Sequence, residues 1–428
     1  MTTTLRASLR AALLSGTAAV AIAGIAAMAG MAATGARAED VIVFHNWSSG
    51  PEVAALTVLK EGLEARGHAW TDVAIPHDTG SNVSLLNLVT GGNPPNAFLE
   101  SSPGFYRDLA AMGLARPLTD FFEEGGYAEH LPASVVQSIT VDGEVMKVPT
   151  AVHLDGMIYW NKAVAEAAGV DPEAWTSLDA MFADFPKIRE AGYVPLALGA
   201  QQWQVGYLAH ALAAATGGPE FFNAVYGPEP DPAALDSAEM RTLLEWLRRF
   251  QAEADEGSVN RDWNVTTNTV ITGQALMQVH GDWMKGEWTA AGKVAGVDFG
   301  CEQLPGALAN VVTVDTWGVL GGQTPEMDQA ELDFAAVVLD PAVQGAFAAA
   351  KGSTPTRLDA EGEIDACSRA VLGYLEDPAT QVPNPHSTVD ADWQSSLWDV
   401  LFNYWSDPEM TADEAIAEMQ DNYDAILG

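Results

Sequence analysis

Short apolar strands alternate with helical segments near the start of this chain, and this alternation is the feature that most constrains its fold. Strands that are bounded by turn residues and separated by helices favour a mainly parallel sheet with helices on both faces. The sequence therefore predicts an α/β fold. In chain order, the expected elements are a strand at 41–44, a helix at 52–66, a strand at 73–75, a helix at 83–90 and a strand at 97–99.

Polar and aromatic residues follow the carboxyl ends of two of these strands. Asn46 and Trp47 come soon after the first strand, and Glu100 and Ser101 come directly after the last. Open α/β sheets bind their ligands in the crevice at the carboxyl ends of the strands. We therefore expect these four side chains to face a ligand.

The N-terminal segment has the pattern of a secretory signal peptide. Arg6 and Arg10 flank the start of an uncharged apolar run at 11–33, and the triplet at 36–38 has the small-x-small cleavage pattern. We expect 1–38 to be removed and the mature protein to be periplasmic. No cysteine follows the cleavage point, so lipid anchoring at that position is not expected.

Length and charge narrow the class of protein. Residues 39–428 are too many for one ordinary core and suit either two α/β lobes or one large enzyme domain. The chain has 20 basic and 58 acidic side chains and a formal net charge of −38. This excess of acid argues against nucleic acid and anionic lipid as partners. The excess of acidic side chains indicates either a surface that simply keeps the protein soluble or a surface adapted to high salt.

The chain has only two cysteines, Cys301 and Cys367. This number excludes a disulfide-dense scaffold and any cysteine-rich zinc or iron–sulfur site. In an oxidising compartment the two residues either form one disulfide or are small, buried, unpaired side chains. The sequence leaves both alternatives open.

The rest of the chain is richer in helix. Two strand candidates, at 145–149 and 157–161, are separated by His153-Leu154-Asp155, as expected of extended crossings between lobes, and residues 310–320 are again rich in β-formers. The expected helices are 178–190, 206–216, 238–253, 267–279, 331–350, 393–404 and 412–427.

Familiar catalytic motifs are missing from the sequence. It contains no phosphate-binding P-loop, no H-E-x-x-H zinc motif, no G-x-S-x-G elbow and no G-x-G-x-x-G after a strand, and its histidines are not at metal-ligand spacing. No metal or cofactor is therefore expected. Paired carboxylates for glycoside hydrolysis stay open, because their separation depends on the fold.

Several turns place an aromatic ring beside hydrogen-bonding side chains. Sugars need this combination, because their C–H faces pack on aromatic rings while their hydroxyl groups bond to carboxylates, amides, Lys or His. One such turn alone is weak evidence, since a loop tryptophan more often covers a core. The residues concerned are Asn46, Trp47 and Glu52; Gln202 and Trp203; Asp282 and Trp283; and Asp315, Lys351 and His386.

Taken in order, these groups resemble the solute-binding proteins of bacterial ABC sugar importers, in particular glucose/mannose-binding proteins and, more distantly, maltose-binding protein. The resemblance covers essentially all of 39–428, and its GGNPP and GDW turns are specific in combination. The matching stretches are FHNWSSGPE at 44–52, GGNPPNAF at 91–98, VPTAVH at 148–153, PLALG at 195–199, MQVHGDW at 277–283, DTWG at 315–318 and KGSTPTR at 351–357.

The resemblance implies a type II periplasmic-binding-protein fold. In such a fold, two α/β lobes are joined by a multi-strand hinge and close around a ligand in a central cleft. The N-terminal lobe is expected to comprise 39–150 plus 314–355, and the C-terminal lobe 151–313 plus 356–428.

The resemblance also implies roles for individual residues. Trp47 and Trp283 match aromatic positions at the cleft, and Trp203 matches a third stacking wall. Positions that bond to hydroxyl groups in the glucose/mannose group match Glu52, His153, Asp315, Lys351 and His386.

Two departures from that group concern the identity of the sugar. Asn46 stands where a second tryptophan is often found. The region where a glutamine and a histidine are common is occupied by Leu99, Glu100, Ser101 and Ser102.

The sequence thus predicts a monomeric, non-enzymatic receptor with a neutral sugar ligand. It is expected to capture a glucose- or mannose-like monosaccharide or a small oligosaccharide, and to deliver it to the permease of an ABC importer. Two alternatives stay open: a secreted carbohydrate-active enzyme, and the same binding fold with a polyol or compatible solute as ligand.

Overall fold

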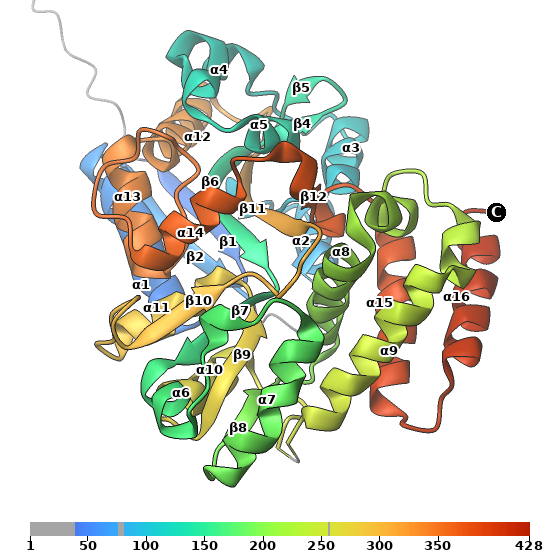
Figure 1. Ribbon diagram of the computed structural model, residues 1–428. Helices are drawn as coiled ribbons and strands as arrows, with labels where there is room; N and C mark the ends of the chain where they lie inside the picture. The colour runs from blue at the N-terminus through green and yellow to red at the C-terminus, as the bar shows by residue number, and fades with distance from the viewer. Residues whose placement is uncertain (1–38, 76–80, 256) are drawn as a thin grey trace, which may run out of the picture. The chain divides into compact units, whose positions relative to one another are not determined.

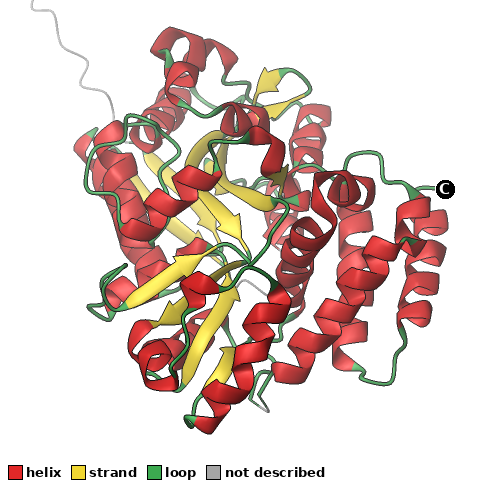
Figure 2. Ribbon diagram, in the orientation of Figure 1, coloured by secondary structure: helices red, strands yellow, loops and turns green. Residues whose placement is uncertain are grey.

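The computed structural model of the protein describes residues 39–75, 81–255 and 257–428. The predicted signal peptide, 1–38, lies outside them. The described chain contains two main β-sheets with helices packed around them (Figure 1, Figure 2). The prediction of an α/β fold is confirmed.

The first sheet contains the N-terminal strands in the order β12-β11-β3-β1-β2, with β6 also paired to β11. Its strands are β1 (Asp40–His45), β2 (Ala69–Ala74), β3 (Ala97–Leu99), β6 (Val148–Asp155), β11 (Asn310–Val319) and β12 (Gln381–Pro383). β1 pairs in parallel with β2 and β3, as the alternating pattern predicted, whereas β11 runs antiparallel to β3 and β6.

The second sheet contains four strands in the order β10-β7-β9-β8. They are β7 (Met157–Asn161), β8 (Val194–Ala197), β9 (Ala275–His280) and β10 (Phe299–Glu302). A separate short hairpin pairs β4 (Thr140–Val141) with β5 (Glu144–Val145).

The chain passes from the first sheet to the second through β6 and β7, with only Gly156 between them. Gly156 has φ of +74°. A Cβ atom there would lie 2.1 Å from the Cβ of Ala211, so both the backbone conformation and the packing require glycine. The crossing predicted around His153 is present, but His153 itself lies inside the long strand β6 and not in a loop.

Helices cover both sheets (Figure 2). Those that precede β6 or follow β11 directly are α1 (Gly50–Ala65), α2 (Ser81–Thr90), α3 (Pro103–Ala111), α4 (Thr119–Gly125), α5 (Ala133–Ile139), α12 (Pro325–Val338) and α13 (Pro341–Lys351). The others are α6 (Lys162–Ala168), α7 (Leu178–Glu190), α8 (Gln202–Tyr226), α9 (Ala238–Glu253), α10 (Trp263–Ile271), α11 (Lys285–Ala290), α14 (Ala366–Tyr374), α15 (Ala391–Ser406) and α16 (Ala412–Ile426).

Three predicted helices are wrong in extent. The helix predicted at 206–216 is part of the longer α8. The helix predicted at 267–279 ends at Ile271, because Gly273 takes a positive φ of 74° and β9 begins at Ala275. All residues of β9 are buried, so its nearly continuous apolar run does not distinguish strand from helix by periodicity. The helix predicted at 331–350 is divided into α12 and α13 where Asp340 caps the second helix.

Cys301 in β10 and Cys367 in α14 form a disulfide, which settles the alternative that the sequence left open. Their Cα atoms are 5.8 Å apart. In the described part of the chain, no single helix is long and apolar enough to cross a membrane. Only α12 and α13 together meet the length and composition criteria, as a pair bent by 67°.

Candidate functional site

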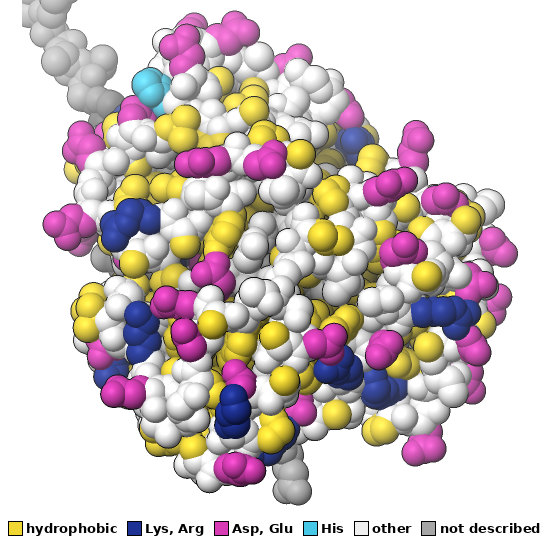
Figure 3. Space-filling model, in the orientation of Figure 1, with side chains coloured by type: hydrophobic (Ala, Val, Ile, Leu, Met, Phe, Trp, Pro, Cys, Tyr) yellow, Lys and Arg dark blue, Asp and Glu magenta, His cyan; other side chains and the backbone are white. Residues whose placement is uncertain are grey.

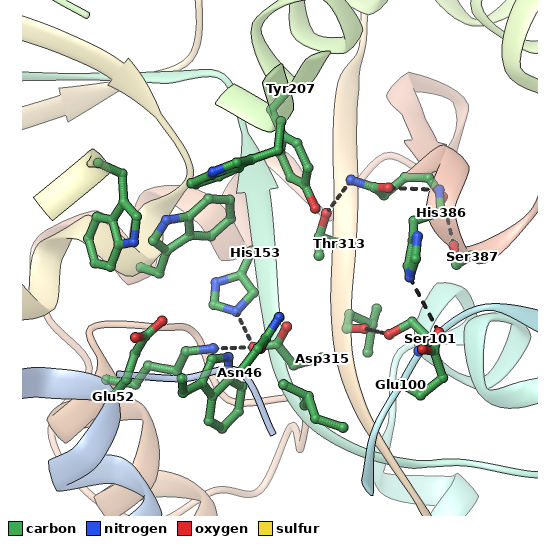
Figure 4. A pocket seen from close by; sticks show the side chains of 18 of the residues that line it. Asn46, Glu52, Glu100, Ser101, His153, Tyr207, Thr313, Asp315, His386 and Ser387 are labelled. Carbon is green, nitrogen blue, oxygen red and sulfur yellow. Dashed lines mark hydrogen bonds and ion pairs between the residues drawn. The ribbon is translucent and has the colours of Figure 1, made fainter. Parts of the chain in front are cut away.

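A cavity of about 410 Å³ lies where elements of the two sheets meet (Figure 4). It is lined by Asn46, Trp47, Glu52, Leu99, Glu100, Ser101, His153, Trp203, Tyr207, Trp263, Trp283, Thr313, Val314, Asp315, Lys351, Asn384, His386, Ser387 and Trp398. A cavity that combines aromatic rings with a few polar side chains is the usual form of a small-molecule site.

Four polar residues of the cavity come from elements of the first sheet and the helix that packs on it. Asn46 follows β1, Glu100 follows β3, Asp315 lies in β11 and Lys351 ends α13. Parallel pairing of β1 and β3 brings their carboxyl ends to the same edge of the sheet. The fold therefore gathers side chains that are more than 300 positions apart in the sequence.

Glu52 has a structural partner as well as a place in the cavity wall. Its Oε2 accepts hydrogen bonds from the backbone N–H groups of Ser48 (2.9 Å) and Ser49 (2.8 Å). Together with the Ser49 side chain, this makes a capping box at the start of α1. The carboxylate is thus held in one orientation beside the positive end of the helix.

A buried network of charged side chains lies in the cavity wall. Both nitrogens of His153 bond to carboxylates, Nδ1 to Asp282 and Nε2 to Asp315 Oδ2 at 2.9 Å, and Lys351 Nζ also bonds to Asp315 Oδ2. Carboxylates only accept hydrogen bonds, so the imidazole ring donates at both nitrogens and is charged. Burial disfavours this charge, but the two carboxylates outweigh it and raise the pKa of His153 to about 9.

Asp315 is correspondingly held ionised. Burial opposes its negative charge, but Lys351 and His153 outweigh that effect and keep the pKa of the carboxyl group well below its usual range. The positive charges of Lys351 and His153 and the negative charges of Asp315 and Asp282 therefore compensate one another within the protein.

Lys351 also covers one of the predicted aromatic positions. Its Nζ lies 3.8 Å from the ring centroid of Trp47, at cation–π distance. The edge of Trp47 meets Trp317 at 5.5 Å between centroids, and only 5% of Trp47 is exposed. Trp47 thus contributes mainly as a buried support for the ammonium group.

Glu100 and His386 form a second pair of polar side chains in the cavity wall. Oε1 of Glu100 accepts hydrogen bonds from the backbone N–H groups of Ser101 (2.9 Å) and Ser102 (2.6 Å). His386 Nε2 lies 3.3 Å from the same oxygen. The Glu100 side chain is almost fully buried, whereas 40% of the His386 side chain is exposed.

The buried side chain of Asp155 holds two of the residues that line the cavity. Its carboxylate accepts hydrogen bonds from Thr313 Oγ1 (2.9 Å) and Asn384 Nδ2 (2.8 Å), both of which belong to cavity residues. Burial raises the pKa of Asp155 to about 7, although these hydrogen bonds work in the opposite direction. The carboxylate joins β6 to β11 and to the segment that carries His386.

The other wall of the cavity is aromatic. Tyr207 lies 5.7 Å from Trp203, 5.9 Å from Trp283 and 6.0 Å from Trp398, measured between ring centroids. Trp203, Tyr207, Trp283 and Trp398 are all half-buried, so part of each ring is accessible. These residues come from α8, α15 and the turn after β9.

The structure brings eleven of the thirteen predicted site residues to the cavity lining and leaves out Gln202 and Asp282. Gln202 bonds to Asp399 instead. Asp282 is fully buried behind the lining, where it contacts His153.

Sequence analysis missed Tyr207, Trp263 and Trp398 among the lining residues. Each lies within a helix, where an aromatic residue at helical spacing indicates a core position and gives no signal of a cavity. Asn384 and Ser387 were detectable only through their neighbour His386. Among the described residues, no group of three or more His, Cys, Asp or Glu side chains is placed to hold a metal ion.

Comparison with known proteins defines the class. Residues 47–344 match the family described as bacterial extracellular solute-binding protein. A Rhizobium meliloti (strain 1021) protein named "Probable sugar-binding periplasmic protein" is 32% identical over 401 residues, which cover 91% of this chain and 95% of that protein.

Solved structures share the fold. A chitin oligosaccharide binding protein has a TM-score of 0.77 at 19% identity and covers 91% of this chain and 98% of its own. Maltose-bound T. maritima MalE3 has a TM-score of 0.75 at 17% identity and covers 91% and 100% of the two chains.

The chain therefore belongs to the family of bacterial extracellular solute-binding proteins. The predicted family and the type II fold are confirmed. Because the members of this family are transport components and not catalysts, the prediction of a non-enzymatic protein is also confirmed, and the alternative of a carbohydrate-active enzyme is set aside. The assignment of residue ranges to the two lobes stays a prediction.

Proposed function

We propose that this protein is a periplasmic receptor that binds a sugar in the cavity and delivers it to the permease of an ABC importer. The observation that carries the proposal is the cavity itself, in which half-buried aromatic rings face carboxylates, a lysine and histidines. Such a site pairs C–H faces with rings and hydroxyl groups with charged partners. The name of the Rhizobium meliloti relative agrees with this ligand class.

The arrangement of charges favours a neutral ligand. Lys351 and His153 are both paired with carboxylates, and His386 is paired with Glu100. An anionic ligand would have to separate Lys351 or His153 from its carboxylate partner to gain a cationic partner.

The size of the cavity favours a small sugar. Its volume of about 410 Å³ lies toward the lower end of the ~300–1,000 Å³ that is usual for small-molecule pockets. We therefore propose a glucose- or mannose-like monosaccharide or a small oligosaccharide. Asn46 lines the cavity with an amide in place of a second indole, which offers hydroxyl groups a donor and an acceptor.

The mechanism is non-covalent. The ligand-bound cleft is stabilised because both lobes contact the sugar, and β6 and β11 are the strands about which the lobes close. The closed form then docks on the permease as a monomer released into the periplasm.

A thermal-shift screen with neutral sugars, polyols and compatible solutes tests the proposal. A ligand that binds only the folded protein raises its melting temperature by mass action. We expect a shift with one or a few neutral sugars and none with choline, glycine betaine or glycerol phosphate. A shift with a polyol or betaine and with no sugar would contradict the proposed ligand class.

A further inference from the structure

One face of the helix α8 carries part of the aromatic wall of the cavity. Trp203 and Tyr207 lie one turn apart on this helix, and both line the cavity. In Figure 4 the ring of Tyr207 points into the cavity. Gly206 and His210 also lie one turn apart on α8, but they are buried behind the lining. They face Trp398 of α15, which does line the cavity.

The indole N–H of Trp398 is held by a buried histidine. Its Nε1 donates a hydrogen bond of 3.0 Å to Nε2 of His210, a residue that is fully buried. Burial lowers the pKa of His210 to about 3, and the neighbouring His386 acts in the same direction. His210 is therefore neutral at ordinary pH, and Nε2 is its acceptor nitrogen.

Aromatic contacts fix the imidazole ring of His210 in turn. Its centroid lies 4.7 Å from the ring of Tyr226, 5.9 Å from that of Tyr207 and 5.8 Å from that of Trp398. Phe222 meets the same ring edge-on at 6.4 Å. Because the imidazole is packed against several neighbours, its acceptor nitrogen keeps one position.

Gly206 leaves the space that the indole occupies. A Cβ atom at this position would lie 2.5 Å from Nε1 and 2.6 Å from Cε2 of Trp398. Any larger residue would therefore push the ring away from His210. The helix α8 thus holds Trp398 through a hydrogen bond from one turn and a close fit to the turn before it.

This hydrogen bond decides which part of Trp398 a ligand can use. An indole has one donor and no acceptor nitrogen. Since His210 binds that donor, the accessible part of the half-buried Trp398 ring is apolar. Trp203 is in the same state, because its Nε1 donates to Oε1 of Gln201 at 2.9 Å. This wall of the cavity therefore suits the C–H face of a sugar and not its hydroxyl groups.

We infer that His210 is a positioning residue for sugar binding, because it holds the Trp398 indole so that the ring face, and not the N–H group, meets the ligand. This inference rests on the proposed function. His210 lies behind the cavity lining and acts on the ligand only through Trp398. Without the acceptor nitrogen, the indole is free to turn and its N–H group loses its partner, and both effects weaken binding.

A double-mutant cycle tests this role. The probes are D-glucose, D-mannose and maltose, each titrated by calorimetry into the mature protein. His210→Leu removes the acceptor and should weaken the affinity about tenfold. His210→Gln should bind within about twofold of the wild type, because its side-chain oxygen accepts a hydrogen bond near the position of Nε2. In Trp398→Phe, which has no indole N–H, His210→Leu should cause no further loss.

The indole N–H signals in the NMR spectrum give a second readout that needs no ligand. In protein labelled at the tryptophan nitrogens, the Trp398 signal is identified by its absence from Trp398→Phe. A hydrogen bond to an imidazole nitrogen deshields the indole proton. We therefore expect the signal to move upfield in His210→Leu and to stay near its wild-type position in His210→Gln.

A pair of glycine variants tests the fit of the indole. Gly206→Ala should displace the ring and reproduce both effects of His210→Leu. The matched control is Gly373→Ala in α14, where a Cβ atom would meet nothing within 4 Å. This control should leave the affinity and the Trp398 signal unchanged. If His210→Leu does not fold, Gly206→Ala replaces it in the cycle, because the smaller ring of Trp398→Phe leaves room for the added methyl group.

Every outcome supports or refutes the role of His210. Rescue by His210→Gln, together with no effect of His210→Leu in Trp398→Phe, supports positioning through the indole N–H. Unchanged affinity in His210→Leu, or an equal loss with and without the Trp398 indole, refutes the role while sugar binding stands. If none of the three sugars binds the wild type, the proposed function fails and the inference fails with it.

Discussion

Trp283 is the residue on which sugar binding should depend most. Its half-buried ring contacts His153, His280 and Tyr207 edge-on, so one part of the indole is fixed while the rest faces the cavity. Removal of a well-packed aromatic anchor commonly costs about 2 kcal/mol of binding free energy. We predict that Trp283→Ala weakens the affinity for the identified sugar roughly 30-fold, measured by calorimetry.

The matched control is Trp246→Ala, a half-buried tryptophan on α9 that packs on Phe182 and Arg249 and does not line the cavity. The melting temperature of Trp283→Ala should stay within a few degrees of the wild type. Unchanged affinity would remove Trp283 from the binding site, and a large loss of stability would mean that the ring serves the fold and not the ligand.

The raised pKa of His153 predicts how the stability of the protein depends on pH. In the unfolded chain its pKa is near 6.5, whereas in the folded protein Asp282 and Asp315 outweigh burial and raise it to about 9. The contribution of the charged His153 to the free energy of unfolding is therefore fully present below pH 6.5 and is lost as pH rises through 9. It amounts to up to about 3 kcal/mol.

A difference measurement isolates this effect. Lys147 acts in the opposite direction, because burial lowers its pKa to about 8. Urea unfolding should therefore compare the wild type with His153→Gln at pH 6.5 and 9.5. We expect the free energy of unfolding to fall more over this interval in the wild type. Equal changes in the two proteins would refute a charged His153.

At the scale of elements, the disulfide is the strongest single link between distant segments. It joins β10 to α14 across a sequence separation of 66 residues. Cross-linking a loop of that size stabilises a protein by about 2–4 kcal/mol. We predict that Cys301→Ser with Cys367→Ser lowers the free energy of unfolding by this amount. Neither cysteine lines the cavity, so sugar affinity should be retained. A double variant as stable as the wild type would contradict this role.

Elements were predictable where local pattern and tertiary environment agree. The parallel strands β1, β2 and β3 follow from apolar runs that end in turn residues, and their polar exits do line the cavity. β9 was not predictable as a strand, because a fully buried strand has no alternation. Trp398 was not predictable as a cavity residue, because its exposure depends on how α15 packs on Gly206 and His210 of α8.

At the scale of the whole molecule, the negative charge should make stability depend on salt. The chain has 58 acidic and 20 basic side chains, and acidic groups are spread over the visible face in Figure 3. Cations screen repulsion among exposed carboxylates, since the Debye length falls from about 10 Å at 0.1 M salt to about 3 Å at 1 M. We predict that the melting temperature rises between dilute buffer and 1 M NaCl. An unchanged melting temperature would refute a salt-adapted surface.

The class of the whole molecule was predictable from the order of its motifs, whereas the ligand was not. The GGNPP and GDW turns, together with the order of the other matching stretches, were the basis for the predicted family. The ligand depends on how the polar side chains and the rings of α8 and α15 are placed around the cavity. Those are properties of the packed structure and not of any local pattern.

Calorimetric titration with the sugar that the thermal screen identifies tests the central claim most directly, provided that the sugar is recovered and analysed afterwards. The account predicts one molecule of sugar bound per protein chain, with the sugar recovered chemically unchanged. Absence of heat with every neutral sugar, or conversion of the sugar during the titration, would contradict the claim that this protein is a sugar receptor.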